Sequence, residues 1–381
     1  MTTPARIPHI PLASFYFFYF AVLGGFMPYW GLYLQGLKFS PESIGQLMAI
    51  LMATRIIAPN FWGYVADKTG KRLQMVRAGA FLLMFFWLGV FFTENFWPLA
   101  FVLLGYSFFQ NAILAQFEAV TIAHLGPQRE LYSRLRLWGS IGFIVTGASL
   151  GMLFDQVSVS WLPLCLLVCA AASWLASLQV PDIATPTHAH RQEDFFSILK
   201  RPTVMAFLAA HFLLQLSHAP YYSFYSIYLE DHGYSRTAIG WLWALAVFAE
   251  VIAFTQMHRW LPRFGEQKVM VVSLLLSAVR WAVIGLGIES PLIVWSAQLL
   301  HAASFATFHA AAISVIYRQF GAGHQGQGQA IYSMLWGLGV ALGSWWTGMV
   351  WDIHPLWSWL TAAAACLCAA LLLQRRPVPV S

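Results

Sequence analysis

The sequence predicts an all-α membrane protein with 12 transmembrane helices. Of its 381 residues, 59% are hydrophobic and only 9% are charged, whereas a soluble domain has roughly 25% charged residues. So few polar side chains cannot cover a water-soluble globule. One span needs about 20 apolar residues, and twelve such spans use nearly the whole chain. The expected spans are 11–36, 43–66, 73–93, 97–124, 134–154, 160–178, 202–229, 237–258, 268–288, 291–317, 327–351 and 355–374.

The basic residues give this arrangement an orientation. With both termini in the cytoplasm, most of the 21 Lys and Arg residues fall in cytoplasmic segments, and the outer loops hold only Lys38 and Arg236. An excess of Lys and Arg in cytoplasmic loops is the usual determinant of topology. We therefore expect a multi-pass protein of the bacterial inner (plasma) membrane with cytoplasmic termini. The net charge of +6 follows from topology, and no nucleic-acid partner is expected. The run 11–36 is too long for the apolar region of a signal peptide, so it is expected to be the first span.

Neither a metal site nor a cofactor is expected. The four cysteines lie in pairs inside apolar runs and are interpreted as small core residues rather than a disulfide framework. His188 and His190 lie in a polar linker, where histidines are usually solvated. The chain has no nucleophile constellation and no phosphate-binding loop, so it is not expected to be an enzyme. The cysteines are Cys165, Cys169, Cys366 and Cys368.

The second half of the sequence repeats the first. At an offset of 195 residues, Gly45 matches Gly240 and Gly70 matches Gly265, and near an offset of 198 the stretch 138–155 resembles 336–352. A parallel repeat of this kind predicts two six-helix bundles related by a pseudo-twofold axis. The expected domains are an N-terminal bundle at 1–179, a cytoplasmic linker at 180–201 and a C-terminal bundle at 202–381.

A glycine-rich loop follows the second span. Residues 63–72 read GYVADKTGKR and resemble the signature loop G-x-x-x-D-x-x-G-[RK]-[RK] of the major facilitator superfamily of transporters. In the repeat, Pro262 stands where the first half has Asp67. The resemblance implies a secondary transporter with alternating access around a midplane site, and it implies that this loop gates the cytoplasmic face. The expected gating residues are Gly63, Asp67, Gly70, Lys71 and Arg72.

Ionisable side chains inside the predicted spans point to a site. A charge at the bilayer centre costs about 2.5–3.5 kcal/mol, so such residues normally face the bundle interior and are functional by default. Three cations stand against two anions, and the surplus positive charge favours an anionic substrate. Ion pairs that only hold helices together remain the alternative. The residues are Arg55, Glu118, Arg136, Glu250 and Arg280.

Part of this set resembles the lactose permease group. Glu118 and Arg136 resemble the carboxylate and arginine that line its sugar cavity, and Phe143 stands where that family has a stacking tryptophan. Glu250 resembles the glutamate of span 8 that links the sugar and proton sites. By this resemblance the pair lines a substrate cavity, and Glu250 takes part in coupling.

The proton pathway of the same group matches less completely. Arg280 and His301 resemble its arginine of span 9 and its histidine of span 10. Three residues after His301, however, this chain has Ser304 in place of the family's proton-carrying glutamate, and Ala253 replaces a sugar-binding asparagine. These departures argue against a galactoside substrate and against an unchanged lactose permease proton mechanism.

The phenylpropionate permease family fits better and over nearly the full length. The shared features are the motif RLWGS at 136–140, the stretch HAPYYSF at 218–224, a glutamate in span 8, His301 with His309 in span 10, and an arginine in span 2 like Arg55. The resemblance implies uptake of an aromatic monocarboxylate together with protons. A planar guanidinium matches a carboxylate, so we expect Arg55, Arg136 or Arg280 to bind it.

These expectations define two groups of residues. Whether His301 titrates or is a neutral core histidine stays open at this stage, and His309 lies roughly 80° around the helix from it. The repeat superposes Arg55 on Glu250, which places a fixed cation opposite a titratable acid. The expected substrate-binding residues are Arg55, Glu118, Arg136, Phe143, Tyr221 and Tyr222, and the expected proton-coupling residues are Glu250, Arg280, His301 and His309.

Other transport functions remain as alternatives. A sugar or nucleoside symporter would use the same pair of Glu118 and Arg136. A drug-efflux antiporter is disfavoured because residues 146–148 read TGA and lack the Gly-Pro signature of span 5 in such families. The expected partners are a small-molecule substrate, protons and the lipid bilayer, and the protein is expected to act as a monomer.

Overall fold

The computed structural model describes residues 7–183 and 195–377, and every regular element within these ranges is helical. The linker histidines His188 and His190 lie outside the described residues. Ten helical stretches of this part of the chain are long and apolar enough to cross a membrane: His9–Gly36, Pro41–Thr69, Arg72–Phe92, Phe96–Leu125, Arg129–Phe154, Val159–Gln179, Arg236–Phe264, Glu266–Leu286, Pro291–Gly321 and Pro355–Arg375.

The helices of the first half begin and end close to the predicted spans. The second helix begins at a local capping signal, because the hydroxyl of Ser40 accepts a hydrogen bond from the N–H of Ser43 (3.2 Å) and Pro41 takes the first helical position. It ends at Gly70, whose φ of 67° is the left-handed conformation that glycine adopts without strain. The six helices are α1 (His9–Gly36), α2 (Pro41–Thr69), α3 (Arg72–Trp87), α4 (Phe96–Leu125), α5 (Tyr132–Phe154) and α6 (Leu162–Gln179).

The second half differs from the prediction in two places. The expected linker ends in a short helix, α7, whose Phe195 ring lies 5.8 Å from that of Phe320. The loop expected at 318–326 is continuous helix except at Gly321, where φ is 60° and ψ is 177°. The elements are α7 (Phe195–Leu199), α8 (Pro202–Asp231), α9 (Arg236–Phe264), α10 (Glu266–Leu286), α11 (Pro291–Leu299), a π-helical turn η4 (Ala303–Thr307), α12 (Phe308–Trp351) and α13 (Pro355–Arg375).

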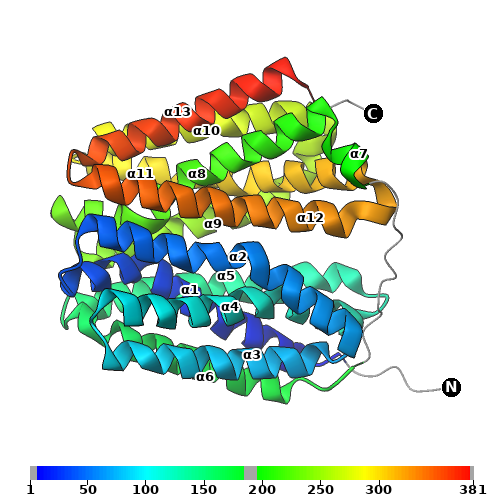
Figure 1. Ribbon diagram of the computed structural model, residues 1–381, viewed down its shortest axis with the longest axis horizontal. Coiled ribbons are helices and arrows are strands. Elements are labelled where there is room, and N and C mark those ends of the chain that lie inside the picture. The colour runs from blue at the N-terminus through cyan, green and yellow to red at the C-terminus, as the bar shows by residue number, and fades with distance from the viewer. Residues whose placement is uncertain (1–6, 184–194, 378–381) are drawn as a thin grey trace.

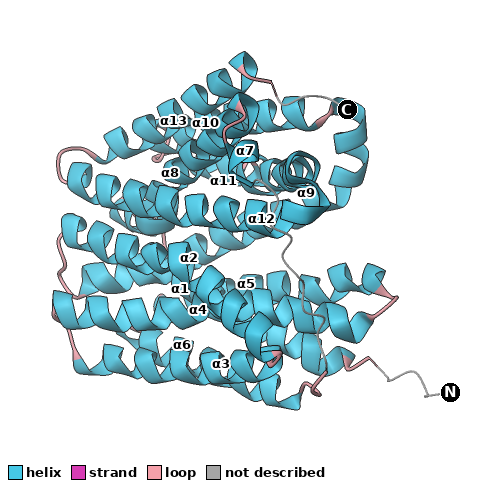
Figure 2. Cartoon of the chain, turned by 45° about the vertical axis from the view of Figure 1, so that its right-hand side comes forward, coloured by secondary structure: helices cyan, strands magenta, loops and turns pink. Residues whose placement is uncertain are grey.

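The two halves of the chain lie on opposite sides of the molecule. Figure 1 shows α1 to α6 in the lower part and α7 to α13 in the upper part. They are joined by α2 packed against α12 and by α5 packed against α9. Asp155 and the α1–α2, α3–α4 and α5–α6 connections lie at one end of the helices, called the Asp155 end. Asp67 and the α2–α3 and α4–α5 connections lie at the other, called the Asp67 end. In a view turned by 45° from that of Figure 1, the ribbons of the two halves diverge on the side of the N-terminus (Figure 2).

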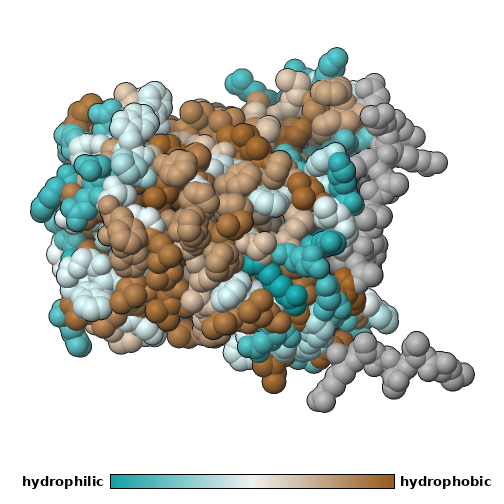
Figure 3. Space-filling model, turned by 60° about the horizontal axis from the view of Figure 1, so that its bottom comes forward, coloured by the Kyte–Doolittle hydropathy of each residue, from teal (hydrophilic) through white to brown (hydrophobic). Residues whose placement is uncertain are grey.

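A belt of hydrophobic side chains covers the middle of the visible face, and hydrophilic residues gather toward the ends of that face (Figure 3). Large apolar side chains stand exposed over several helices, including Phe85 on α3, Trp97 and Phe101 on α4, and Phe248 on α9. A soluble protein rarely exposes apolar patches of this extent. The belt is what the hydrocarbon core of a bilayer would cover.

Backbone-to-backbone contacts hold the two halves together toward the Asp155 end. A Cβ atom built on Gly45 would lie 2.5 Å from the carbonyl oxygen of Ser344, and one built on Gly240 would lie 2.4 Å from that of Gly147. Such distances leave room only for glycine, so α2 meets α12 and α5 meets α9 without intervening side chains. The glycines that revealed the sequence repeat therefore lie at the contact between the halves.

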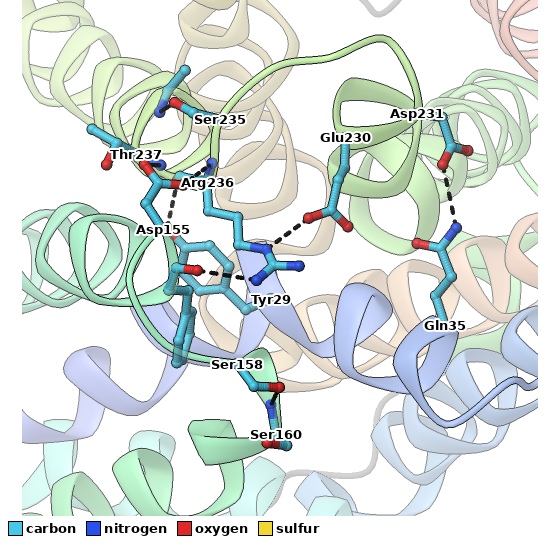
Figure 4. Close-up of polar contacts among 12 residues, drawn as sticks. Tyr29, Gln35, Asp155, Ser158, Ser160, Glu230, Asp231, Ser235, Arg236 and Thr237 are labelled. Carbon is cyan, nitrogen blue, oxygen red and sulfur yellow. Dashed lines mark hydrogen bonds and ion pairs between the residues drawn. The ribbon is translucent and has the colours of Figure 1, made fainter.

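A charged clamp closes the same end (Figure 4). The carboxylate of Asp155, from the first half, accepts hydrogen bonds from the backbone N–H groups of Arg236 (2.8 Å) and Thr237 (3.1 Å), the first two residues of α9. The guanidinium of Arg236 donates to the carbonyl of Phe154 (3.0 Å) and to Glu230 (2.6 Å). Because free N–H groups and the helix dipole attract anions, α9 begins on a carboxylate supplied by the opposite half.

The clamp depends on the charge of Asp155. Partial burial acts to raise the pKa of this carboxyl, but the hydrogen bonds from Thr237 and Arg236 and the Arg236 charge outweigh it and hold the pKa below its ordinary value. The ionised form therefore stabilises the closed arrangement above the ordinary carboxyl pKa. That stabilisation is lost as the pH falls through the lowered value.

We expect Asp155→Asn to separate the halves at the Asp155 end at neutral pH, because a neutral amide accepts weaker hydrogen bonds from the start of α9. Spin labels at positions 35 and 231, whose side chains are joined by a 3.3 Å hydrogen bond, measure the separation in a variant without native cysteines. The wild type should approach the Asp155→Asn distance only in acid. Asp352→Asn changes the symmetry-related acid and serves as the control. Equal distances for wild type and Asp155→Asn at neutral pH would contradict the clamp.

Candidate functional site

Five helices bring the predicted intramembrane charges to the middle of the molecule. They are α2 with Arg55, α4 with Glu118, α5 with Arg136, α9 with Glu250 and α10 with Arg280. The side chains do not form one cluster. Arg136 pairs with Glu118, Arg280 and Glu250 are linked through His301, and Arg55 stands apart from both sets.

Arg55 is a cation without an acidic partner. Within residues 7–183 and 195–377, no hydrogen bond or ion pair of its guanidinium is found, and its central carbon lies 4.7 Å from the ring centre of Trp336. Arg55 is only partly exposed. The helices approach closely here, since a Cβ atom on Gly337 would lie 2.9 Å from the Cβ of Arg55. The result is a positive charge over an indole ring where α2 meets α12.

An aromatic surface continues from Trp336 and is called the aromatic wall; it consists of Phe305, His309, Tyr332 and Trp336. The rings of Phe305 and Trp336 meet edge to face at 5.4 Å, and those of Phe305 and His309 stack at 6.0 Å. The Nδ1 atom of His309 lies 3.0 Å from the hydroxyl of Tyr332. The wall thus begins at Trp336, the ring under the Arg55 guanidinium, and continues through Phe305 to His309 and Tyr332.

Arg136 and Glu118 form a loose pair. Arg136 Nε lies 3.8 Å from Glu118 Oε1, and the two side chains are 31% and 34% exposed. The guanidinium also lies 3.9 Å from the ring centre of Phe20. At this distance and exposure the pair is not closed to a ligand. Phe143 is almost fully buried, and its backbone packs against Gly24 of α1.

Arg280 lies at the centre of a buried hydrogen-bond network. It is fully buried and donates to His301 Nδ1 (2.7 Å), to the hydroxyl of Ser304 (3.1 Å) and to Gln298 Oε1 (3.2 Å). On its other side, His301 Nε2 lies 2.5 Å from Glu250 Oε1. Glu250, Arg280 and His301 therefore meet as the sequence predicts, and Ser304 binds Arg280 directly.

The remaining predicted residues take different positions. The ring of Tyr221 is fully buried, 4.3 Å from the Arg280 guanidinium carbon, and its hydroxyl donates to Gln298 (3.2 Å). Tyr222 is partly exposed and stacks on His218 at 5.5 Å. His309 belongs to the aromatic wall rather than to the Arg280 network. Of the two tyrosines, Tyr222 is therefore the one that is partly exposed.

In the signature loop, Asp67 forms an ion pair with Arg72, and Arg72 also donates to Gln116 of α4 (2.5 Å). Gly70 ends α2 and Lys71 precedes α3, while a Cβ atom on Gly63 would meet no atom within 4 Å. In the second half, Glu266 at the start of α10 pairs with Arg318 of α12 at 3.0 Å. The ion pairs of the two halves therefore join different helices.

Several site residues were missed by sequence reasoning. Phe305 stands four residues from both His301 and His309, a helical spacing that could have revealed it. Gln298 is an amide in an otherwise apolar run. Trp336 marks only the start of the repeated segment, because nothing in the sequence indicates that it lies over Arg55. Asp155 likewise reads as an ordinary loop acid.

A cavity of about 620 Å³ lies elsewhere, between the beginnings of α1 and α5. Apolar side chains such as Phe17, Phe18 and Trp138 line it, together with Arg134. None of the intramembrane charges borders it, so it is separate from the site.

Comparison with known proteins agrees with this arrangement. The model of the MFS_1 like family matches residues 9–361. The chain belongs to this family. It is 29% identical over 332 residues to the "Probable 3-phenylpropionic acid transporter" of Escherichia coli (strain K12), covering 84% of this chain and 85% of the relative. It is 28% identical to the maltose permease of Geobacillus stearothermophilus, covering 73% and 70%.

The fold of this MFS_1-like protein also resembles a crystal structure of a mutant of the nucleoside transporter NupG. The TM-score is 0.87 at 18% identity, and the match covers 97% of this chain and 99% of NupG. The relatives and the structural neighbour are membrane transporters. The protein is therefore a membrane-spanning transporter of the major facilitator superfamily and not an enzyme.

We expect Gly337→Ala to displace Arg55, because the added Cβ would lie 2.9 Å from the Arg55 Cβ and 3.1 Å from the carbonyl oxygen of Met52. Overpacking of this kind costs about 1–3 kcal/mol of stability. Thermal unfolding in detergent measures the loss. Gly323→Ala is the matched control, since nothing lies within 4 Å of its Cβ position. Equal melting temperatures for the two variants would mean that α2 and α12 are not in tight contact at Arg55.

Proposed function

We propose that this transporter is a proton symporter that imports a small aromatic monocarboxylate across the bacterial inner membrane. The observation that carries the proposal is Arg55, whose guanidinium lies beside the aromatic wall and has no acidic partner in the part of the chain that the structure describes. A carboxylate supplies the charge that Arg55 lacks, and its two oxygens match the planar N–H donors. An aryl group on the same molecule packs on Trp336 and Phe305.

The other two arginines are less available for this role. Arg280 already uses its guanidinium on His301, Ser304 and Gln298. Arg136 has Glu118 as a weak partner at 3.8 Å. Arg55 thus becomes the first choice among the three candidates from the sequence, and Tyr222 is the partly exposed one of the two predicted tyrosines. The E. coli relative named as a probable 3-phenylpropionic acid transporter supports this substrate class.

The proposal includes the arrangement of the chain in the membrane. Two further helical stretches, α8 and the part of α12 that follows Gly321, complete twelve spans with the ten apolar ones. Most of the polar residues of α8, such as His211, Gln215 and His218, are buried inside the protein and not exposed to lipid. The proposed units are two six-helix bundles at 1–179 and 202–381, joined by the linker 180–201.

Alternating access follows from the different packing at the two ends. Glycine contacts and the Asp155 clamp join the halves at the Asp155 end. The charge pairs described for the Asp67 end, such as Asp67 with Arg72 and Glu266 with Arg318, lie within one half each. We assign the Asp67 end and both termini to the cytoplasm by the distribution of basic residues. The structure then corresponds to a state closed toward the outside.

The proposed function is tested by comparing three substrate classes for proton-coupled uptake. In proteoliposomes with an internal pH dye, 3-phenylpropionate is expected to acidify the lumen as it enters with protons, while maltose and uridine are expected to have no effect. Arg55→Gln should weaken 3-phenylpropionate binding about 10- to 100-fold, since a hydrogen bond to a charged group contributes about 1.5–3 kcal/mol. Arg134→Gln changes an exposed arginine and is the control.

A sugar or nucleoside symporter is the second candidate, favoured by the half-exposed pair of Glu118 and Arg136 and by the maltose permease and NupG likenesses. It would appear in the same assay as proton flux with maltose or uridine alone. Arg55→Gln would then leave transport intact, whereas Glu118→Gln would reduce it.

Proton coupling is assigned to Glu250, the acid of the Arg280 network. We expect Glu250→Gln to abolish pH-driven accumulation of 3-phenylpropionate, because an amide cannot take up and release a proton, while exchange of internal for external substrate continues. Accumulation and exchange are measured with radiolabelled substrate. Glu94→Gln, at an exposed loop acid, should behave as the wild type. Normal accumulation by Glu250→Gln would remove this residue from the coupling mechanism.

A further inference from the structure

His301 lies between a guanidinium and a carboxylate, and this geometry determines where its proton sits. Arg280 Nη1 is 2.7 Å from His301 Nδ1. A guanidinium has N–H donors and no acceptor. His301 Nδ1 must therefore accept this hydrogen bond and cannot carry a proton while the contact lasts.

The other ring nitrogen must then be the donor. His301 Nε2 is 2.5 Å from Glu250 Oε1, and a neutral imidazole without a proton on Nδ1 has it on Nε2. The Nε2–H group therefore donates to the Glu250 carboxylate. The two contacts together select one neutral tautomer of His301.

Arg280 is held too firmly to move aside for a second proton on the His301 ring. It is fully buried, and Ser304 and Gln298 bind it from two further directions. Gln298 is fixed in turn, because it accepts from the hydroxyl of Tyr221 (3.2 Å) and donates to that of Tyr225. An imidazolium would place an N–H on Nδ1 against an N–H of Arg280 and bring two cations together.

The other groups that face this pair do not favour an imidazolium either. The rings of His218 and Tyr221 on α8 lie 6.4 Å and 5.2 Å from that of His301, and Phe305 stacks on it at 6.0 Å. Arg136 of α5 and Tyr222 of α8 act electrostatically on Glu250. Among the described residues in contact with His301, Glu250 is the one carboxylate.

Exposure separates the two partners. The Glu250 side chain is 14% exposed and that of His301 is 6% exposed. We propose that His301 stays neutral throughout transport and acts as a positioning residue: held by Arg280 in its Nε2–H tautomer, it orients Glu250, which alone takes up and releases the proton. The proton adds to the carboxylate oxygen that does not accept from His301, so the Nε2–H···Oε1 bond is kept and no proton passes through the imidazole.

This inference rests on the proposed proton coupling and makes it more specific. The residue three positions after His301 is Ser304, which binds Arg280 through its hydroxyl (3.1 Å) and cannot ionise. In the proposal the proton is carried instead by Glu250, which lies on a different helix, α9. His301 links the fixed charge of Arg280 to that residue.

His301→Gln tests the proposal, because a glutamine amide can accept from Arg280 and donate to Glu250 but cannot titrate. We expect His301→Gln to accumulate radiolabelled 3-phenylpropionate, driven by pH, to within about threefold of the wild type. This change is smaller than the loss of one hydrogen bond to a charged group would cause. The pH profile of accumulation should be unchanged. His301→Leu, which lacks both hydrogen bonds, should lose accumulation. A His301→Gln protein that exchanges substrate but no longer accumulates it would show that His301 carries the proton and would overturn the proposal.

A second measurement does not depend on transport or on the His301 variants folding. In ¹⁵N-histidine spectra of the wild type, the His301 signals are those that shift in Glu250→Gln. We expect them to report a proton on Nε2 only and to stay constant from about pH 5 to pH 8, where an ordinary histidine titrates. Titration of these signals would overturn the proposal even if no transport substrate were found. Whether Glu250→Gln loses proton coupling tests the proposed function, and the histidine spectra of the wild type do not depend on that result.

Discussion

The buried positive charge of Arg280 is the constraint around which the second half is arranged. A guanidinium cannot lose its proton and has to be satisfied where it lies. Ser304, Gln298 and His301 each accept from it, and Tyr221 lies against it. These partners come from α8, α11 and the helical segment around η4, so one charge fixes how these segments pack. Glu250 balances the charge of Arg280 through the imidazole of His301.

The first half deals with its buried arginine differently. Arg55 stands on α2 where the repeat places Glu250 on α9, and among the described residues it contacts an indole face of Trp336 but no acid. A cation on an aromatic ring keeps part of its electrostatic stabilisation while its N–H donors stay free. The second half thus contains a hydrogen-bonded network that ends at the titratable Glu250. The first half contains Arg55, whose guanidinium has no hydrogen bond among the described residues. Substrate binding and proton binding can be assigned to different halves for this reason.

Much of the fold follows from the sequence, because apolar runs and loop charges each report a separate constraint. The positions of most helices follow from the apolar runs, and the expected orientation follows from the loop charges. The grouping of Glu250, Arg280 and His301 comes instead from the resemblance to the lactose permease group. Contacts between elements far apart in sequence were not accessible in this way. Asp155 reads as a loop acid until α9 is placed beside it, and Trp336 reads as a lipid-facing tryptophan until α12 is placed beside α2. The loop expected after residue 317 proved helical, because a single glycine at 321 makes the turn and the flanking residues continue as helix.

The π-helical turn η4 has a mechanical consequence. His301, Phe305 and His309 follow one another at intervals of four residues, and their rings form one continuous stack, with 6.0 Å between neighbouring centres. In a regular α-helix, eight residues bring the side chain roughly 80° out of line, whereas the wider π turn keeps these rings aligned. Phe305 therefore contacts His309 and Trp336 of the aromatic wall on one side and the imidazole of His301 on the other. A guest ring packed on Phe305 would therefore contact a column of rings whose far end, His301, binds the Glu250 carboxylate.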